Sequence, residues 1–134
     1  MSTSPAAERA ATLLHLSKPT DVLAAVPYVL GFRPEHSVVV LGLAGARSRS
    51  RFAGRADLPA PDDALGRYEL AERFVAPFRV DGCDQAVVVG YGPAERADPA
   101  VRLVNQTLTL EGVRLREALR VENGRYWSYV CEVR

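Results

Sequence analysis

The side chains with the clearest chemical potential are arginines that cluster in one short stretch of this 134-residue chain. Residues 41–56 hold four arginines and no acidic residue, whereas residues 57–98 hold nine acidic residues and four arginines. A guanidinium group presents a planar set of donors that matches phosphate or carboxylate. We hypothesise an anion or ligand site, with phosphate or a nucleotide as the anion, formed by Arg47, Arg49, Arg51, Tyr91 and Arg125. The alternative is a solvated hairpin loop whose charges only maintain solubility.

A second polar group precedes and follows the first apolar run. Arg33, Glu35 and His36 come just before it, and Asp57 lies on the segment expected to return beside it. Such residues could do acid–base work. Ser37 follows His36 directly, however, and neighbouring residues of a strand point to opposite faces, which argues against a Ser-His-Asp arrangement. We therefore expect a structural role, with Asp57 accepting from Arg33 or from backbone N–H groups, and predict no catalytic residue.

Three aromatic side chains lie close together near the carboxyl end. Tyr126, Trp127 and Tyr129 follow Arg125, and aromatic residues with arginine are enriched in interface anchors. On a strand, Trp127 and Tyr129 share one face and Tyr126 takes the other. We predict an interface here, with a second copy of the chain or a protein partner pairing along this hairpin.

Composition excludes several classes of protein. Lys+Arg number 17 against 16 Asp+Glu, so a basic nucleic-acid coat protein and an acidic tail protein are both excluded. All the basic residues except Lys18 are arginine, as expected from a GC-rich bacterial genome. Cys83 and Cys131 lack metal-binding spacing, so we predict free thiols, no metal and no cofactor. No signal peptide or membrane-length apolar run is visible, so we expect a cytoplasmic protein without membrane contact.

Hydrophobic periodicity predicts a mixed α/β chain. The first helix begins at Pro19, is kinked or ended by Pro27, and has Gly31 as its C′ residue. A later helix is expected to begin with Asp98 as N-cap and Pro99 at its first position. The other expected elements are an edge strand at 12–16, strands at 37–43, 51–58, 85–91 and 113–121, a helix at 61–78 whose apolar face is Leu65, Tyr68, Ala71, Val75 and Phe78, an Asn123-Gly124 turn and a final arm at 125–133.

The order of these elements predicts where loops meet. Strands 37–43 and 51–58 form an antiparallel hairpin, and a helical crossover brings 85–91 parallel to one of its arms. A second crossover brings 113–121 parallel to 85–91. If 85–91 runs parallel to 37–43, the 44–50 loop gathers with Tyr91 and the Asn123-Gly124 turn at one edge, where open α/β sheets bind ligands.

Three segments carry a resemblance to a known family. They are residues 21–43 (DVLAAVPYVLGFRPEHSVVVLGL), 55–59 (RADLP) and 124–128 (GRYWS), which occur in the family's order. The chain resembles the uncharacterised actinobacterial family named domain of unknown function 4192. Members of that family commonly continue beyond the Trp-Ser motif, so the resemblance implies a short or truncated member. It implies no established activity.

Together these observations predict one domain. We expect a disordered tail at 1–11 and a single α/β domain at 12–134, with a mixed sheet of about five strands, helices on both faces and antiparallel hairpins at the ends. The predicted function is a protein-interaction or ligand-binding module with an arginine-lined sheet edge. The alternative is an enzyme acting on a phosphorylated or nucleotide-like small molecule.

Overall fold

The computed structural model describes residues 19–129 of the chain, so the predicted tail at 1–11 and the predicted strand at 12–16 lie outside the described residues. A five-stranded mixed sheet in the order β2-β1-β3-β4-β5 forms the centre of the domain. The elements are α2 (Pro19–Leu30), β1 (Ser37–Ala44), β2 (Arg49–Asp57), α3 (Ala64–Glu72), α4 (Val75–Val80), β3 (Gln85–Tyr91), α5 (Ala94–Leu110), β4 (Arg114–Glu122) and β5 (Arg125–Ser128).

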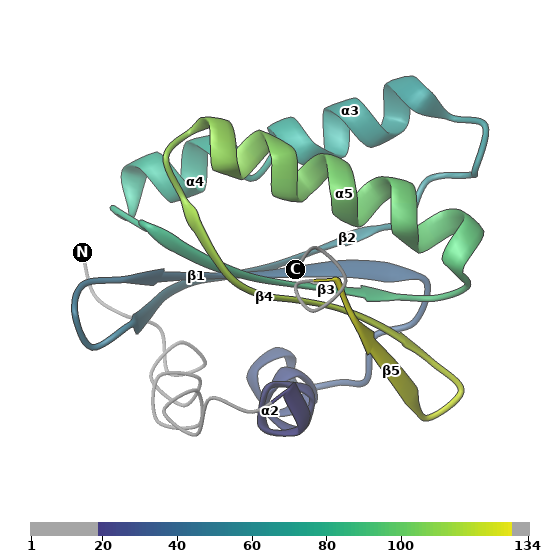
Figure 1. The fold of residues 1–134 in the computed structure, drawn as a ribbon, viewed down its shortest axis with the longest axis horizontal. Coiled ribbons are helices and arrows are strands. Elements are labelled where there is room, and N and C mark those ends of the chain that lie inside the picture. The colour runs from purple at the N-terminus through teal and green to yellow at the C-terminus, as the bar shows by residue number, and fades with distance from the viewer. Residues whose placement is uncertain (1–18, 130–134) are drawn as a thin grey trace.

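Helices cover both faces of this sheet (Figure 1). Helix α2 lies on one face, and α3, α4 and α5 lie on the other. The central strands β1 and β3 are the two β-branched runs, and they are buried along nearly their whole length. Strands covered on both faces need apolar side chains in both directions, which explains these continuous runs. The predicted α/β class is confirmed, and none of the helices within residues 19–129 is long and apolar enough to cross a membrane.

Helix α2 follows the sequence closely. It begins at Pro19, and its inner face buries Val22, Val26 and Val29 against the sheet. Gly31 has φ +84° and donates its N–H to the carbonyl of Pro27 at 2.8 Å. This left-handed conformation at C′ suits glycine, because a Cβ would be strained there.

The helical segment predicted between 61 and 78 is divided into α3 and α4. Asp63 caps α3 by accepting the N–H of Gly66 at 2.8 Å, and the helix ends before Phe74. Ala71, Val75 and Phe78 are buried as predicted, but Leu65 and Tyr68 are 68% and 55% exposed. The predicted apolar face therefore applies only to the later half, because α3 touches the core through its last turn.

Helix α5 begins five residues earlier than the sequence suggested. Its N-cap is Pro93, and the N–H of Ala97 donates to the carbonyl of Pro93 at 2.9 Å. The prediction of an N-cap at Asp98 was wrong, and Pro99 lies inside the helix. The carboxylate of Asp98 is thereby free to bind side chains from the sheet, as described below. The predicted inner face of Val101, Val104 and Leu108 is fully buried.

Two hairpins and one parallel pair confirm most of the predicted topology. Strands β1 and β2 are antiparallel, β4 and β5 are antiparallel, and β3 and β4 are parallel across α5. Asn123 and Gly124 both have positive φ, 53° and 76°, as a two-residue type I′ hairpin turn requires. Helix α5 packs close to β3, since a Cβ on Gly90 would lie 2.7 Å from a methyl of Val101.

The pairing of β1 with β3 differs from the arrangement that would have gathered the predicted site. The two strands are antiparallel, with Ser37 opposite Tyr91 and Leu43 opposite Gln85. Strand β3 has the direction of β2, but it lies beside β1 on the side away from β2. Consequently the β1–β2 turn and the carboxyl end of β3 lie at opposite ends of the sheet (Figure 1).

Candidate functional site

The five residues predicted to bind an anion do not come together. Arg49 pairs with Ala44, next to the β1–β2 turn that carries Arg47. Tyr91 is the last residue of β3, and it pairs with the first residue of β1 at the other end. Arg125 follows the β4–β5 turn at that same end. The sheet thus has two distinct ends that carry predicted site residues.

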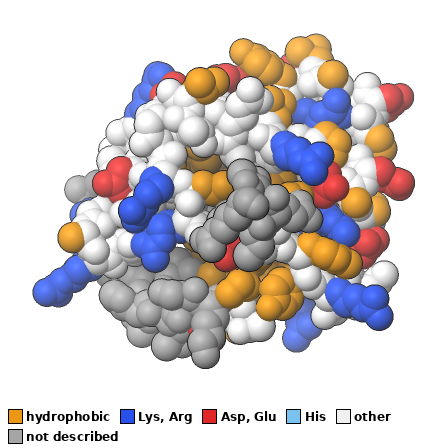
Figure 2. Space-filling model, viewed as in Figure 1, with side chains coloured by type: hydrophobic (Ala, Val, Ile, Leu, Met, Phe, Trp, Pro, Cys, Tyr) orange, Lys and Arg blue, Asp and Glu red, His pale blue; other side chains and the backbone are white. Residues whose placement is uncertain are grey.

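The first of these, the arginine end, comprises the β1–β2 turn, the start of β3 and the start of β4. Arg47, Arg49 and Arg51 are exposed there, and Figure 2 shows Lys and Arg side chains on this side of the molecule as well as on the opposite side. Gln85 is 5% exposed, and its amide donates to the carbonyl of Gly45 at 2.9 Å. Gln85 therefore fastens the turn to β3.

Arg116 of β4 joins the same cluster, which the sequence did not indicate. Its guanidinium donates to the hydroxyl of Ser48 at 2.5 Å and to the amide oxygen of Gln85 at 3.0 Å. Ser48 in turn donates to that amide oxygen at 2.7 Å. The turn that carries Arg47 is therefore held by bonds among Ser48, Gln85 and Arg116, whereas the buried hydroxyl of Ser50 has no partner among residues 19–129.

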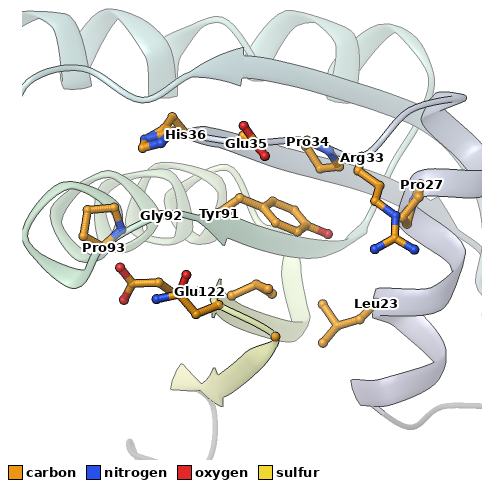
Figure 3. A pocket seen from close by; sticks show the side chains of 13 residues that line it. Leu23, Pro27, Arg33, Pro34, Glu35, His36, Tyr91, Gly92, Pro93 and Glu122 are labelled. Atoms are coloured by element: carbon orange, nitrogen blue, oxygen red, sulfur yellow. The ribbon is translucent and has the colours of Figure 1, made fainter.

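The other end of the sheet contains a cavity of about 500 Å³, which we call the Tyr91 cavity (Figure 3). Leu23 and Pro27 of α2 form its apolar side. Three loops complete it, namely residues 33–36 before β1, 91–93 after β3 and 121–124 at the β4–β5 turn. The walls thus come from segments far apart in the sequence, and the cavity lies where β3 and β4 end.

The loop before β1 is held in an unusual conformation. His36 has φ +47°, which is uncommon for a residue with a side chain, and its carbonyl accepts the N–H of Leu58 at 2.9 Å. Ser37 is fully buried and donates its hydroxyl to the carbonyl of Glu35 at 2.6 Å. These bonds fix the backbone, so the exposed side chains of Arg33, Glu35 and His36 stand at the rim of the cavity.

The loop after β3 needs a glycine. Gly92 has φ +149°, and a Cβ there would lie 3.2 Å from the side chain of Leu58. Its N–H donates to the carbonyl of Val121 at 3.0 Å, which joins this loop to the end of β4. Two walls of the cavity are therefore bonded to each other through the backbone.

Tyr91 is the unusual side chain of the cavity. Its hydroxyl oxygen is buried and has no hydrogen-bond partner among residues 19–129. Burial raises the pKa of this hydroxyl above its ordinary value, so the group is protonated at neutral pH. In Figure 3 the ring crosses the cavity, and the hydroxyl points toward the side where Arg33 and Pro27 lie. A buried hydroxyl without a partner is costly, which makes it informative about a missing partner.

Asp57 does not take the role expected of it. Its carboxylate accepts from Arg55 at 2.5 Å rather than from Arg33. The guanidinium of Arg55 also lies 5.9 Å from the centre of the Phe32 ring, so Arg55 connects β2 to the end of α2. Among the described residues, Arg33 makes no ion pair, and its charge remains available at the cavity.

Arg120 holds the C-terminal hairpin on α5. Its side chain is 12% exposed, lies 3.6 Å from the carboxylate of Asp98, donates to Glu122 at 3.0 Å and reaches the carbonyl of Gly92 at 3.3 Å. It also stacks on Trp127, with 3.9 Å between the guanidinium carbon and the ring centre. One cation thus connects α5, β4, β5 and the wall of the cavity.

The predicted interface aromatics divide into two groups. Tyr129 is buried, and its hydroxyl donates to Asp98, so it supports the hairpin and is unavailable to a partner. Hydrogen bonding to Asp98 adds to burial in raising the pKa of Tyr129. Tyr126 and Trp127 are 42% and 38% exposed, and an interface through them stays a prediction.

Neither cysteine chemistry nor metal binding finds support among residues 19–129. No group of three or more potential ligand side chains occurs in that range. Cys83 is buried, and burial, with a smaller effect from Asp81, raises the pKa of its thiol to about 11. Cys131 lies outside the described residues.

Comparison with known families identifies the family of this chain. The sequence model of the family described as Domain of unknown function (DUF4192) matches residues 19–134, and the chain therefore belongs to that family. No protein of curated function matches the chain. The family description carries no activity, so the function has to be inferred from the two ends of the sheet.

Proposed function

Taking membership of this uncharacterised family as the premise, we propose that the domain binds a small organic molecule in the Tyr91 cavity. The observation that carries the proposal is the hydroxyl of Tyr91, a residue that lines the cavity: this hydroxyl is buried and has no partner among the described residues. A bound molecule with a hydrogen-bond acceptor would supply that partner. The unsatisfied hydroxyl is then a cost to the empty protein that binding removes.

The size and position of the cavity support the same function. A volume of about 500 Å³ falls within the range typical of small-molecule sites. It also lies outside the carboxyl ends of the parallel strands β3 and β4, where ligands of open α/β sheets bind. Leu23, Pro27 and Val121 would contact the body of the molecule, and polar groups at the rim would orient it.

The protonation state of Tyr91 favours binding over catalysis. A tyrosine whose pKa is raised by burial donates a hydrogen bond at neutral pH and is a poor general base. The alternative, an enzyme acting on a phosphorylated or nucleotide-like molecule, predicts phosphate release from ATP or p-nitrophenyl phosphate. Release that disappears with Arg33→Gln would favour this alternative over simple binding.

The arginine end supports a second candidate function, the binding of an anionic partner. The favourable observation is the Ser48–Gln85–Arg116 cluster, which orders the turn that carries Arg47 and Arg49. A turn that is already ordered loses less conformational entropy on binding than an unrestrained loop. This end is exposed, so we propose it only for multiple weak contacts with a protein or other polyanion.

A fragment screen followed by protein amide chemical shifts tests both candidates. For the cavity we expect shifts in residues 33–36, 91–93 and 121–124, and about tenfold weaker binding by Tyr91→Phe because one hydrogen bond is lost. The matched control is Tyr68→Phe, which alters an exposed tyrosine of α3 and leaves binding unchanged. Shifts confined to residues 47–51 and 116 would move the function to the arginine end, and no shifts at either end would contradict both candidates.

A further inference from the structure

Two donor groups on residues that line the Tyr91 cavity have no partner among residues 19–129, and together they indicate the charge of the proposed ligand. The hydroxyl of Tyr91 is buried and unsatisfied, and the guanidinium of Arg33 makes no hydrogen bond or ion pair with another residue between 19 and 129. We infer that the cavity binds an organic anion whose acid group accepts from both Arg33 and Tyr91. This inference rests on the proposed function and names the class of its ligand.

The orientation of the two groups supports a shared acceptor. In Figure 3 the Arg33 side chain and the Tyr91 hydroxyl both reach toward the side of the cavity bounded by Pro27. A carboxylate or phosphate has several lone pairs on separate oxygens, so it accepts from a guanidinium and a hydroxyl at the same time. A ligand with a neutral acceptor would accept the hydrogen bond from Tyr91 but would not form an ion pair with Arg33.

The acidic residues at the cavity do not cancel this preference. Glu122 is already paired with Arg120 at 3.0 Å, so its charge is compensated within the protein. Glu35 is exposed at the rim, where solvent screens its charge. In Figure 3 Glu122 lies toward Pro93, on the side away from Arg33. We therefore expect the acid group of the ligand to bind on the α2 side of the cavity, near Arg33. Any hydrogen-bond donors of the ligand would lie near Glu122, at the β4–β5 turn.

The rest of the cavity determines the remainder of the ligand. Leu23, Pro27 and Val121 offer apolar contacts, whereas free inorganic phosphate would leave them uncovered. Since apolar contact and charge pairing both contribute to affinity, an acid with a hydrophobic body uses the whole cavity. The ligand class is therefore an amphipathic organic acid rather than a free inorganic anion.

Three probes of matched shape test the charge preference directly: 3-phenylpropionate, 3-phenylpropionamide and 3-phenylpropylamine. Titration followed through the amide shifts of residues 91–93 should give at least tenfold tighter binding of the acid than of the amide, with the amine weakest. Arg33→Gln should weaken the acid about tenfold and leave the amide unchanged, whereas Tyr91→Phe should weaken both. Arg47→Gln, at the arginine end, is the matched control and should change neither.

The outcomes separate this inference from the proposed function. Equal binding of acid and amide, or an acid affinity that Arg33→Gln does not change, overturns the anion and leaves cavity binding intact. If none of the three probes binds, the fragments that bind in the screen described above test the inference by their charge. Anionic fragments would support it, and a set of neutral or cationic fragments would overturn it. If no fragment at all shifts these amides, the proposed function falls together with the inference.

Discussion

The two ends of the sheet carry similar side chains, but one end is an exposed surface and the other surrounds a cavity. At the arginine end, Ser48, Gln85 and Arg116 bond to one another, and the buried hydroxyl of Ser50 beside them has no partner among residues 19–129. At the cavity end, the hydroxyl of Tyr91 is buried with no partner among residues 19–129. The arginine end has many charges on an exposed surface, whereas the cavity end has few charges around a hollow.

The number of charged residues alone therefore does not decide which end is the better candidate for a site. Water solvates an exposed guanidinium group, so an arginine on a turn is stable there without a bound ligand. An unsatisfied buried hydroxyl costs free energy in every molecule of the empty protein. Both ends have such a hydroxyl, on Ser50 and on Tyr91, but of these two residues only Tyr91 lines the Tyr91 cavity, which makes the cavity end the stronger candidate.

The largest expected effect comes from Arg120, which holds the cavity end together. Arg120→Ala removes the contacts with Asp98, Glu122, the Gly92 carbonyl and Trp127, and leaves Asp98 partly buried without its cation. We expect a loss of about 3 kcal/mol in the free energy of unfolding, because removing one partner of a buried ion pair strands the other. Urea denaturation measures this change.

Arg125→Ala is the matched control for Arg120, since Arg125 is an exposed arginine of the same hairpin. It should change the free energy of unfolding by less than about 0.5 kcal/mol. A loss below about 1 kcal/mol for Arg120→Ala would show that these contacts are no stronger than those of a surface ion pair.

A smaller loss is expected at the arginine end from Gln85→Ala. The substitution leaves the carbonyl of Gly45 and the hydroxyl of Ser48 without their amide partner. Since water can reach the turn after a small opening, we expect a loss of about 2 kcal/mol. Hydrogen exchange should also become faster in residues 45–49. Arg47→Ala, which removes an exposed neighbour, should leave both measurements unchanged, and equal effects of the two substitutions would contradict the role of Gln85.

The smallest effect has the opposite sign. Tyr91→Phe removes a buried hydroxyl that has no partner among residues 19–129, so the variant should be more stable by about 1 kcal/mol at pH 7. Because folding raises the pKa of this tyrosine, the wild type should lose stability as pH rises through about 10, the value in the unfolded chain. The advantage of the variant should therefore grow above pH 10. A destabilised variant would mean that the hydroxyl has a partner inside the protein.

Local chemistry made much of the fold predictable. Pro19 and Gly31 bounded α2, the β-branched runs identified β1 and β3, and Asn123-Gly124 located the last hairpin. These features depend on neighbouring residues, so a single sequence contains the information needed to find them. The parallel pairing of β3 with β4 also followed, because one helix between two strands requires a crossover.

The neighbour of β3 was not predictable in this way. After the hairpin, the chain could return beside β2 or beside β1, and the apolar pattern of a doubly covered strand is the same in either place. The structure has β3 beside β1 and antiparallel to it. That one choice separates Arg47 from Tyr91 and brings Arg33 and His36 to the cavity instead. The start of α5 was missed for a related reason, because Asp98 binds Arg120 and Tyr129 across the fold rather than the backbone of its own helix.

The walls of the cavity also have a consequence for synthesis of the chain. They come from residues 23–36, 91–93 and 121–124, so the last wall emerges from the ribosome only after most of the described domain. A nascent chain that stops before β4 has the Tyr91 hydroxyl but lacks the wall formed by Val121 and Asn123. The cavity is therefore complete only once β4 has joined the sheet, so the proposed ligand binding would depend on completion of the fold.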